Sequence, residues 1–305
     1  MKIELSDLVK QLLYKLLPNS IIFRLRFFWK HGYWPNLKKP RSLTEKLLWL
    51  MVWDKNPLRA KVVDRIKARE FVQEHAPTCK SPKHLWVGES LTLEIWNNLP
   101  QIFVLKANHG SHMTYFVDKS NDSFDAIASL SKTWVNKDYS LDFGEWVYHD
   151  LPRLLIAEEK LDIKGKIPAD WKFYCTNGEV LYVSLIMDRG QSAACENFYL
   201  SDFSRLNNLS SAVFPSGPDI DEPVCFKNAV RIAKQLSKPF DFIRVDLYLV
   251  GESVYFGEMT CYPGAALVTF KPKNYDFEFG SRIALDKSFI SENPRPVWKN
   301  YIKSA

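Results

Sequence analysis

Residues 240–260 constrain the fold of this chain more than any other segment. The sequence FDFIRVDLYLVGESVYFGEMT alternates in character on either side of Gly251-Glu252-Ser253. This pattern is typical of two β-strands joined by a three-residue loop that contains glycine. Folding the chain about Glu252 predicts that position 246 lies opposite 258 and that position 244 lies opposite 260.

The two faces of this hairpin differ in chemistry, because side chains alternate across a strand. One face is expected to carry Arg244, Asp246, Glu258 and Thr260 together with Phe242, Tyr248 and Phe256. The other face is expected to carry Ile243, Val245, Leu247, Leu249, Tyr255 and Met259. The second set is apolar and is predicted to face the core.

Two acids directly opposite each other repel, so Asp246 and Glu258 need a neutralising cation. Arg244 could supply it, since it lies two positions from Asp246. The convergence of both acids on one face favours magnesium, which proteins usually hold with one or two carboxylates plus substrate phosphates.

Composition places the chain among soluble globular proteins. It has 305 residues, 46% hydrophobic and 25% charged, enough for two or three packed subdomains. The five cysteines form no CxxC motif, which indicates a reducing compartment without a zinc knuckle. We find no run of 18 apolar residues and no signal-peptide layout, so a cytoplasmic protein is expected.

Positive charge is concentrated in residues 1–42, which contain nine Lys or Arg residues against two acids. The whole chain has a net charge of +6, so the remainder is close to neutral. Leu, Ile, Phe and Trp recur here at helical spacing. Such a segment can lie on an anionic membrane surface, or it can pack on its own domain with a solvated basic side. No nucleic-acid motif accompanies it, so we expect no nucleic-acid partner.

The remaining elements predict an α+β fold, because strands and helices interleave without regular βα alternation. Ser42 and Glu45 form a capping-box start for the helix after the basic segment. One helix is expected over 58–75, with Asp64, Lys67 and Arg69 as surface charges. The other expected elements are a connector around Pro77, Pro82 and Pro100, a strand–turn–strand at 102–119, a helix at 120–138, a strand at 153–162, a hairpin turning at Asn177-Gly178, loops over 191–224, a helix at 226–238 and a final helix at 282–290.

Several common sites are excluded, since the chain lacks GxxxxGK[ST], GxGxxG, HExxH and GxSxG motifs. Three other features can bind a nucleotide. Lys106 ends an apolar strand before the small-residue turn Asn108-His109-Gly110-Ser111, where phosphate oxygens can be held. The segment Glu158-Glu159-Lys160-Leu161 can meet an adenine edge and a ribose. Asp170 and Lys172 alternate on a strand and can point into one cleft.

In this order the features resemble the ATP-grasp superfamily. RVDLYLVGESVYFGEMTCYPG is similar to the metal-binding hairpin of D-alanine–D-alanine ligases. Residues from about 40 to 280 resemble the narrower TupA-like branch, associated with teichuronopeptide and other bacterial surface polysaccharides. The segments that carry the resemblance are SLTEKLLWL, DRIKAREFV, FVLKANHGS, IAEEKLD, DWKFYCTNGEV, FDFIRVDLYLV and YFGEMTCYPG.

The resemblance implies a role for each matching residue. Lys106 and Lys172 would contact ATP phosphates beside His109, Gly110 and Ser111. Glu158, Glu159, Lys160 and Leu161 would form the adenine hinge, and Asp170 would lie near the ribose. Asp246 and Glu258 would bind magnesium, with Thr260 at a position where the superfamily often has Asn, and Arg244 would stabilise the transferred group. The turn reads GSH where a glycine-rich GSG is more usual, so His112 can restrict the loop or contact substrate.

The resemblance also implies an organisation and an activity. We expect a helical basic region over 1–80, a small subdomain with the phosphate loop over 81–160 and a large subdomain with the metal hairpin over 161–305. The implied activity is an ATP- and magnesium-dependent carboxylate–amine ligase in capsule or O-antigen biosynthesis, joining an amino acid to a uronic acid. Two alternatives are a kinase of a glycan or lipid-linked sugar and a non-catalytic scaffold.

Overall fold

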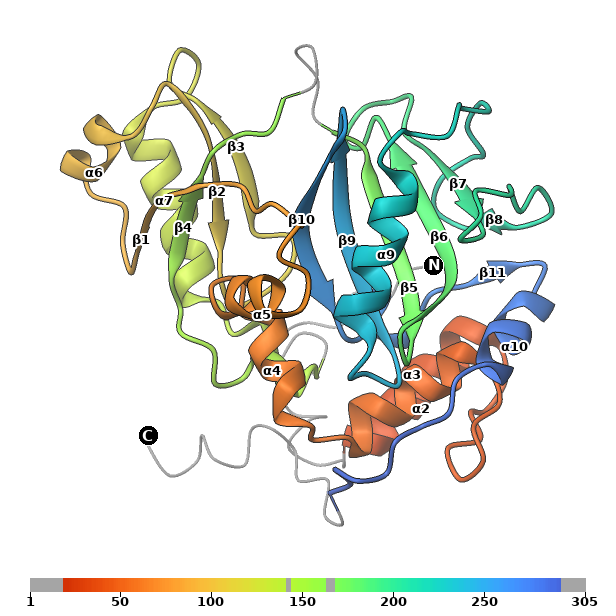
Figure 1. Ribbon diagram of the computed structural model, residues 1–305. Helices are drawn as coiled ribbons and strands as arrows, with labels where there is room; N and C mark the ends of the chain where they lie inside the picture. Colours follow the sequence, from red (N-terminus) through yellow and green to blue (C-terminus); the bar gives the residue numbers. More distant parts are fainter. Residues whose placement is uncertain (1–18, 141–143, 163–167, 292–305) are drawn as a thin grey trace, which may run out of the picture.

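Two separate antiparallel sheets organise the chain in the computed structural model, which describes residues 19–140, 144–162 and 168–291 (Figure 1). The smaller sheet has the strand order β1-β4-β2-β3. Its strands are β1 (His84–Gly88), β2 (Ile102–Ala107), β3 (Thr114–Asp118) and β4 (Leu155–Glu158). Helix α6 (Leu93–Asn98) and helix α7 (Phe124–Asn136) belong to this lobe.

The larger sheet has the strand order β10-β9-β5-β6-β7. Its strands are β5 (Asp170–Thr176), β6 (Glu179–Met187), β7 (Cys195–Tyr199), β9 (Ile243–Val250) and β10 (Ser253–Thr260). Helix α9 (Phe226–Ser237) packs on one face against β9, β5 and β6. Its buried side chains include Phe226, Ala229, Ala233 and Leu236, which recur at the spacing of one helix face.

The remaining elements lie beside the larger sheet or between the lobes. They are α2 (Asn19–His31), α3 (Leu43–Trp53), α4 (Pro57–Val63), α5 (Lys67–His75), the short helices η1 (Trp146–Tyr148) and η2 (Pro263–Ala266), β8 (Ser210–Ser211), β11 (Phe270–Lys271) and α10 (Asn274–Ser281). The predicted capping box is present at α3, where Ser42 and Glu45 bond to each other's backbone N–H.

Each sheet has its own hydrophobic core. The smaller core is built from residues between 91 and 157, with Phe103 and Leu105 fully buried. The larger core unites the five-stranded sheet with α9, α10 and the helices from α2 to α5. The α+β fold expected from the sequence is confirmed.

The hairpin of β9 and β10 has the expected register, since Asp246 pairs with Glu258 and Arg244 pairs with Thr260. It reaches this register in an unexpected way. The turn has two residues, because Ser253 pairs with Val250, so the predicted three-residue loop is wrong.

A β-bulge at Gly257 compensates for the short turn by adding one residue to β10. A Cβ atom at this position would lie 3.0 Å from the carbonyl oxygen of Asp246 and 3.1 Å from Tyr248, so the close approach requires glycine. The bulge also reverses the faces that the sequence predicts for Tyr255 and Phe256. Phe256 pairs with Leu247 and is buried, whereas Tyr255 pairs with Tyr248 and is half-exposed.

Three helix predictions need correction. The expected helix over 58–75 is interrupted between α4 and α5, where the Asp64 carboxylate accepts from the N–H groups of Ile66 and Lys67. Asp64 is therefore buried and its side chain holds the turn between the two helices, instead of being a surface charge. The segment 282–290 contains no helix, since the chain turns after α10 ends at Ser281.

Two segments expected to lack regular structure contain it. The connector around the prolines includes β1 and α6, and the loops over 191–224 include β7 and β8. All five cysteines are buried and free.

Candidate functional site

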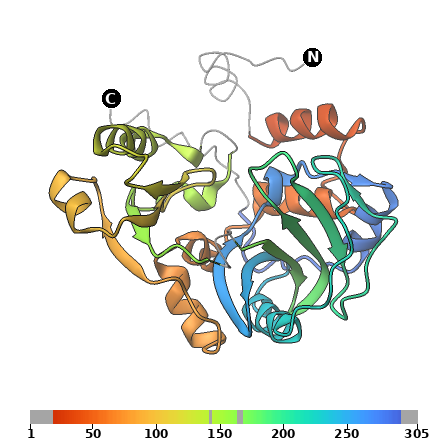
Figure 2. The same cartoon turned by 90° about the horizontal axis from the view of Figure 1, so that it is seen from above.

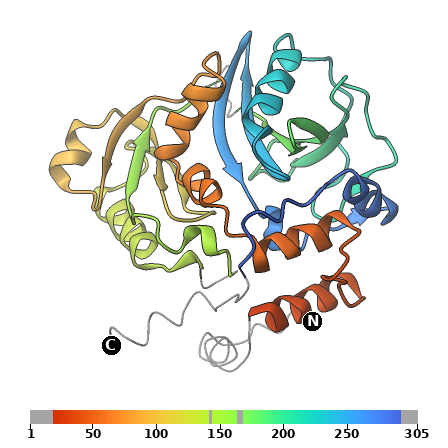
Figure 3. The same cartoon turned by 60° about the horizontal axis from the view of Figure 1, so that its bottom comes forward.

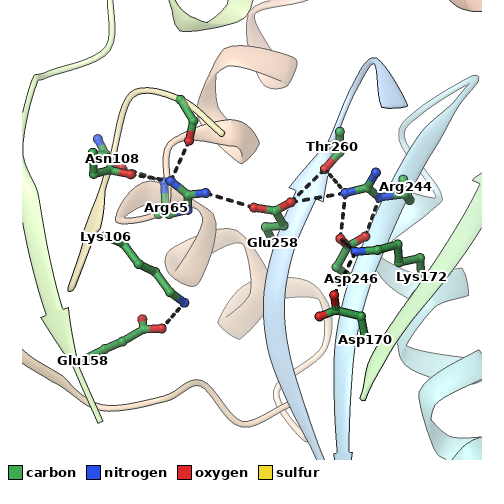
Figure 4. Close-up of polar contacts among 12 residues, drawn as sticks. Arg65, Lys106, Asn108, Glu158, Asp170, Lys172, Arg244, Asp246, Glu258 and Thr260 are labelled. Atoms are coloured by element: carbon green, nitrogen blue, oxygen red, sulfur yellow. Dashed lines mark hydrogen bonds and ion pairs between the residues drawn. The ribbon is translucent and has the colours of Figure 1, made fainter. Parts of the chain in front are cut away.

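A cavity of about 410 Å³ lies between the two sheets and contains most of the residues singled out above. The smaller sheet and its connections contribute Lys106, Ser111, His112, Glu158, Glu159 and Leu161. The larger sheet contributes Asp170, Lys172, Asp246 and Glu258. Figure 4 shows these side chains converging from the two sides.

Asp246 is neutralised by two cations on the same sheet. Lys172 lies opposite it on β5, and its Nζ donates to Asp246 Oδ2 at 2.7 Å. Arg244 donates to both carboxylate oxygens, at 2.6 and 2.7 Å. Such two-pronged contacts are among the strongest hydrogen bonds in proteins. Burial opposes the charged form of Arg244, but Asp246 and Glu258 outweigh it and raise the pKa of Arg244 well above its ordinary value.

Glu258 is held by two arginines. Its Oε1 accepts from Arg244 at 3.2 Å and its Oε2 accepts from Arg65 at 3.1 Å. Burial raises the pKa of the Glu258 carboxyl, but Arg65, Arg244 and Lys172 outweigh it and lower the pKa to about 2. The repulsion expected between the two acids is therefore relieved by side-chain cations in this structure.

Arg65 connects this acid pair to the turn that follows β2. Its guanidinium donates to the carbonyl of Ala107 and, at 2.8 Å, to that of Gly110, and its backbone N–H donates to the Asn108 side chain at 2.8 Å (Figure 4). The turn and the acid pair are thus fixed relative to each other by one side chain.

The turn itself is tightly packed. A Cβ atom at Gly110 would lie 2.3 Å from Met113 and 2.7 Å from Tyr139, so only glycine fits without a shift of these side chains. His112 has a φ of 61°, in the left-handed region that is uncommon for residues other than glycine. Its side chain lines the cavity, whereas His109 is buried and its Nε2 lies 2.9 Å from the carbonyl oxygen of Trp134.

On the smaller sheet, Lys106 forms an ion pair with Glu158, and Arg69 lies 3.8 Å from the same carboxylate. Glu159 accepts from the backbone N–H of Lys83 at 2.8 Å, and its own N–H donates to the Lys83 carbonyl. Lys106 and Arg69 therefore neutralise Glu158, and the Lys83 backbone holds Glu159, at the strand end that the sequence identifies as a hinge.

At the other end of the cavity, Asp170 is shared by two cations. Arg189 donates to its Oδ2 at 2.7 Å, and Lys172 Nζ lies 3.7 Å from the same atom. Arg189 lies in the exposed loop after β6 and lines the cavity.

The structure thus brings together ten of the residues named from the sequence and leaves five others outside the cavity lining. The five are His109, Gly110, Lys160, Thr260 and Arg244. Arg244 lies behind the lining, where it holds both acids and the Thr260 hydroxyl.

Sequence reasoning missed Arg65 and Arg189 as parts of the cavity wall. Arg65 sits between two helices, where an arginine is normally a surface charge, and no local pattern marks it. Arg189 lies just beyond the end of a predicted hairpin strand. In that hairpin the end of the second strand lies beside the start of the strand that carries Asp170, a signal that could have placed Arg189 near the site.

The donor set near Asp246 fits a magnesium ion that also binds substrate phosphates. Among the residues that the structure describes, no group of three or more His, Cys, Asp or Glu side chains could hold a metal. Two carboxylates that border a cavity are the number expected for magnesium completed by phosphates and water. The residues present are therefore compatible with the ion.

Comparisons with solved structures find ligases that resemble parts of the chain. D-alanine–D-alanine ligase from Bacillus anthracis complexed with ATP is 13% identical, with a TM-score of 0.40, and the alignment covers 67% of this chain and 56% of that one. The corresponding enzyme from Helicobacter pylori is 12% identical, with a TM-score of 0.42 and coverage of 80% and 67%. The ATP-grasp ligase PsnB with a minimal precursor, Mg and ADP is 12% identical, with a TM-score of 0.37 and coverage of 66% and 50%. Our chain thus spans little more than half of the first of these proteins.

The fold is that of the ATP-grasp proteins. The model of the TupA-like ATP-grasp family matches residues 45–284, and the chain belongs to this family. No curated protein sequence matches it. The resemblance found in the sequence is therefore confirmed at the level of the family.

Proposed function

We propose that the protein is an ATP- and magnesium-dependent ligase that joins a carboxylate to an amine. The observation that carries this proposal is the cavity between the two sheets, where Lys106 and Lys172 face the acid pair Asp246 and Glu258. Phosphoryl transfer depends mainly on positioning and on neutralising charge, and this arrangement supplies both.

Lys106 and Lys172 are assigned to the ATP phosphates. Each is paired with an acid in the structure described here, Glu158 and Asp246 respectively. A phosphate group entering the cavity offers each ammonium a second anionic partner without exposing it to water. The turn at Gly110 and Ser111 adds backbone N–H groups of the kind that bind phosphate.

The nucleoside end of ATP is assigned to the acidic residues beside these two lysines. Glu158, Glu159, Lys160 and Leu161 form the adenine hinge in this proposal. Asp170 binds the ribose hydroxyls, and its contacts with Lys172 and Arg189 orient it as an acceptor.

Asp246 and Glu258 would hold magnesium, with Thr260 as a third, water-mediated position. When bound, the ion neutralises phosphate charge and orients the transferred phosphoryl group. Arg244 already contacts all three of these side chains. It therefore keeps both acids in place from behind the cavity lining.

The reaction class follows from this charge distribution. The carboxylate oxygen attacks the terminal phosphorus of ATP and ADP leaves, giving an acyl phosphate. The amine then attacks the acyl carbon, inorganic phosphate leaves with the electron pair of the C–O bond, and the amine gives up a proton. Lys172, in the cavity lining, and Arg244, behind it, would stabilise the negative charge that develops in both steps.

Membership of the TupA-like family supports a surface-glycan substrate. We propose a uronic acid as the carboxylate and an amino acid as the amine, in capsule or O-antigen biosynthesis. The proposed setting is the cytoplasm, with peripheral contact to the inner membrane. In the described residues, no helix is long and apolar enough to cross a membrane.

The proposal is tested by measuring ADP release with a panel of uronic acids and amino acids. We expect ADP and phosphate to appear in equal amounts, and only when a carboxylate and an amine are both present. ADP release with a sugar alone and without free phosphate would indicate a kinase, and no release with any pair would favour a scaffold.

A further inference from the structure

Helix α2 carries apolar side chains on two opposite sides. One side is buried in the larger core and consists of Ile22, Phe23 and Phe27. The other side is between 38% and 80% exposed and consists of Ile21, Leu25, Phe28 and Trp29, which we call the α2 stripe. A helix that packs only on its own domain needs a single apolar side, so within residues 19–291, as far as the structure describes them, the α2 stripe is left for a partner.

Trp34 continues the α2 stripe beyond the end of the helix. Its ring centroid lies 6.1 Å from that of Phe28, and the side chain is 52% exposed. Trp29 is 80% exposed. Large aromatic side chains are rarely left in water in this way, and clustered exposed apolar residues mark interaction surfaces.

Charge around the α2 stripe has a single sign. Residues 19–44 contain six Lys or Arg residues and no Asp or Glu. Lys30, Lys38 and Lys39 are exposed. Amphipathic helices with basic residues and Trp, Phe and Leu lie in the interface of anionic bilayers, where each basic side chain near the surface contributes about 1 kcal/mol.

The position of α2 allows it to meet a flat surface. Figures 2 and 3 both show α2 at the outer edge of the molecule, with α3 on its inner side. Helix α3, which packs against α2, also packs against η2, the short helix that follows strand β10.

We propose that the α2 stripe and Trp34 dock the protein on an anionic lipid surface, with Lys30, Lys38 and Lys39 contacting the headgroups. This proposal concerns binding alone and does not depend on the reaction assigned above. If both proposals hold, the membrane holds η2 and the metal hairpin close to an acceptor that is attached to lipid.

The test is flotation of the full-length protein with vesicles of phosphatidylcholine, alone or mixed with phosphatidylglycerol, at low and high salt. We expect binding to the anionic vesicles only, weakened by salt. The variant Phe28→Ser/Trp29→Ser should reduce partitioning by about tenfold or more, since it removes two large apolar side chains from the interface. The variant Lys38→Gln/Lys39→Gln should reduce it by several-fold and lower the salt dependence.

The matched control is Val213→Ser/Val224→Ser, which removes two apolar side chains that are 77% and 84% exposed elsewhere. It should bind like the parent protein, and thermal melting should show that all variants fold. The proposal is overturned if the parent protein does not float, if binding ignores lipid charge and salt, or if the aromatic variant binds like the control. It is also overturned if gel filtration shows that the α2 stripe instead joins two copies of the chain.

Discussion

Arg65 and Glu258 are 193 residues apart in the chain, yet the guanidinium of Arg65 donates to the Glu258 carboxylate at 3.1 Å. The same guanidinium donates to the carbonyls of Ala107 and Gly110 in the turn after β2. One side chain therefore couples the turn assigned to phosphate binding with the acids assigned to magnesium. This relationship makes Arg65 a positioning residue of the site.

Replacing Arg65 tests this role. Arg65→Met should lower ATP consumption by at least about tenfold, because it frees the turn and leaves Glu258 with one cation less. It should also cost about 2–4 kcal/mol of stability, as expected when one member of a partly buried ion pair is removed. Arg65→Lys should restore part of the stability but little of the activity, because an ammonium cannot make the same forked contacts.

The control for these variants is Lys61→Met, which removes a half-exposed cation 3.9 Å from the exposed Glu74. It should change stability by less than about 1 kcal/mol. Equal effects of Arg65→Met and Lys61→Met on turnover would contradict the positioning role.

The acid pair is tested by Asp246→Asn and Glu258→Gln. Each should abolish magnesium-dependent ATP consumption, because a neutral amide is a poor magnesium ligand. The exposed Glu252 at the tip of the same hairpin provides the matched control Glu252→Gln, which should retain activity. Titration of the activity with magnesium measures the effect, and near-normal turnover in either acid variant would refute the assignment.

The two lysines assigned to phosphate should contribute separately to nucleotide binding. Lys106→Met or Lys172→Met should weaken ADP binding by about 10- to 100-fold, the range for a charged hydrogen bond worth 1.5–3 kcal/mol. Calorimetric titration checks this, with the exposed Lys227→Met as control. Unchanged affinity in both lysine variants would indicate that these side chains serve only their acid partners.

Stability should depend on the protonation of Glu145, a buried residue before η1. Burial raises the pKa of its carboxyl to about 8, although Arg244 and Arg26 oppose the shift. The folded state therefore keeps a proton that the unfolded state loses above about pH 4.5, so this group lowers stability as the pH rises towards 8.

Glu145→Gln should remove that loss. The stability of the variant relative to the parent should increase between pH 5 and 8, by up to about 1.4 kcal/mol per pH unit. Urea unfolding at several pH values measures the difference, with the exposed Glu278→Gln as control. A difference that does not change with pH would show that Glu145 is ionised in the folded protein.

Much of the fold follows from local patterns in the sequence. The predicted register of Asp246 with Glu258 is correct because two differences compensate. The turn is one residue shorter than predicted, and the bulge at Gly257 adds one residue to β10. The bulge itself has no clear sequence signal, so the sequence predicts Tyr255 on the core face and Phe256 on the cavity face, the reverse of what the structure shows. The break at Asp64 is similar, since an acid within a helical pattern gives no indication that its side chain accepts from the backbone of a turn.

The predicted parts of the site are those that lie on strands or in short turns. Lys172 and Asp246 lie opposite each other on neighbouring strands, and alternation along each strand is enough to put them on one face. Arg65 and Arg189 reach the cavity from irregular segments. Their positions depend on how the two lobes pack against each other, and the hydrophobic periodicity of the sequence does not predict this packing.

The central claim is that ATP activates a carboxylate for attack by an amine. The most direct measurement uses a carboxylate substrate labelled with ¹⁸O in both oxygens, identified from the panel described above, and analyses the phosphate and the acceptor by mass spectrometry. An acyl phosphate path transfers one ¹⁸O atom to the inorganic phosphate and yields an amide that retains the other. Unlabelled phosphate, or an acceptor that gains a phosphoryl group while no phosphate is released, would contradict the account.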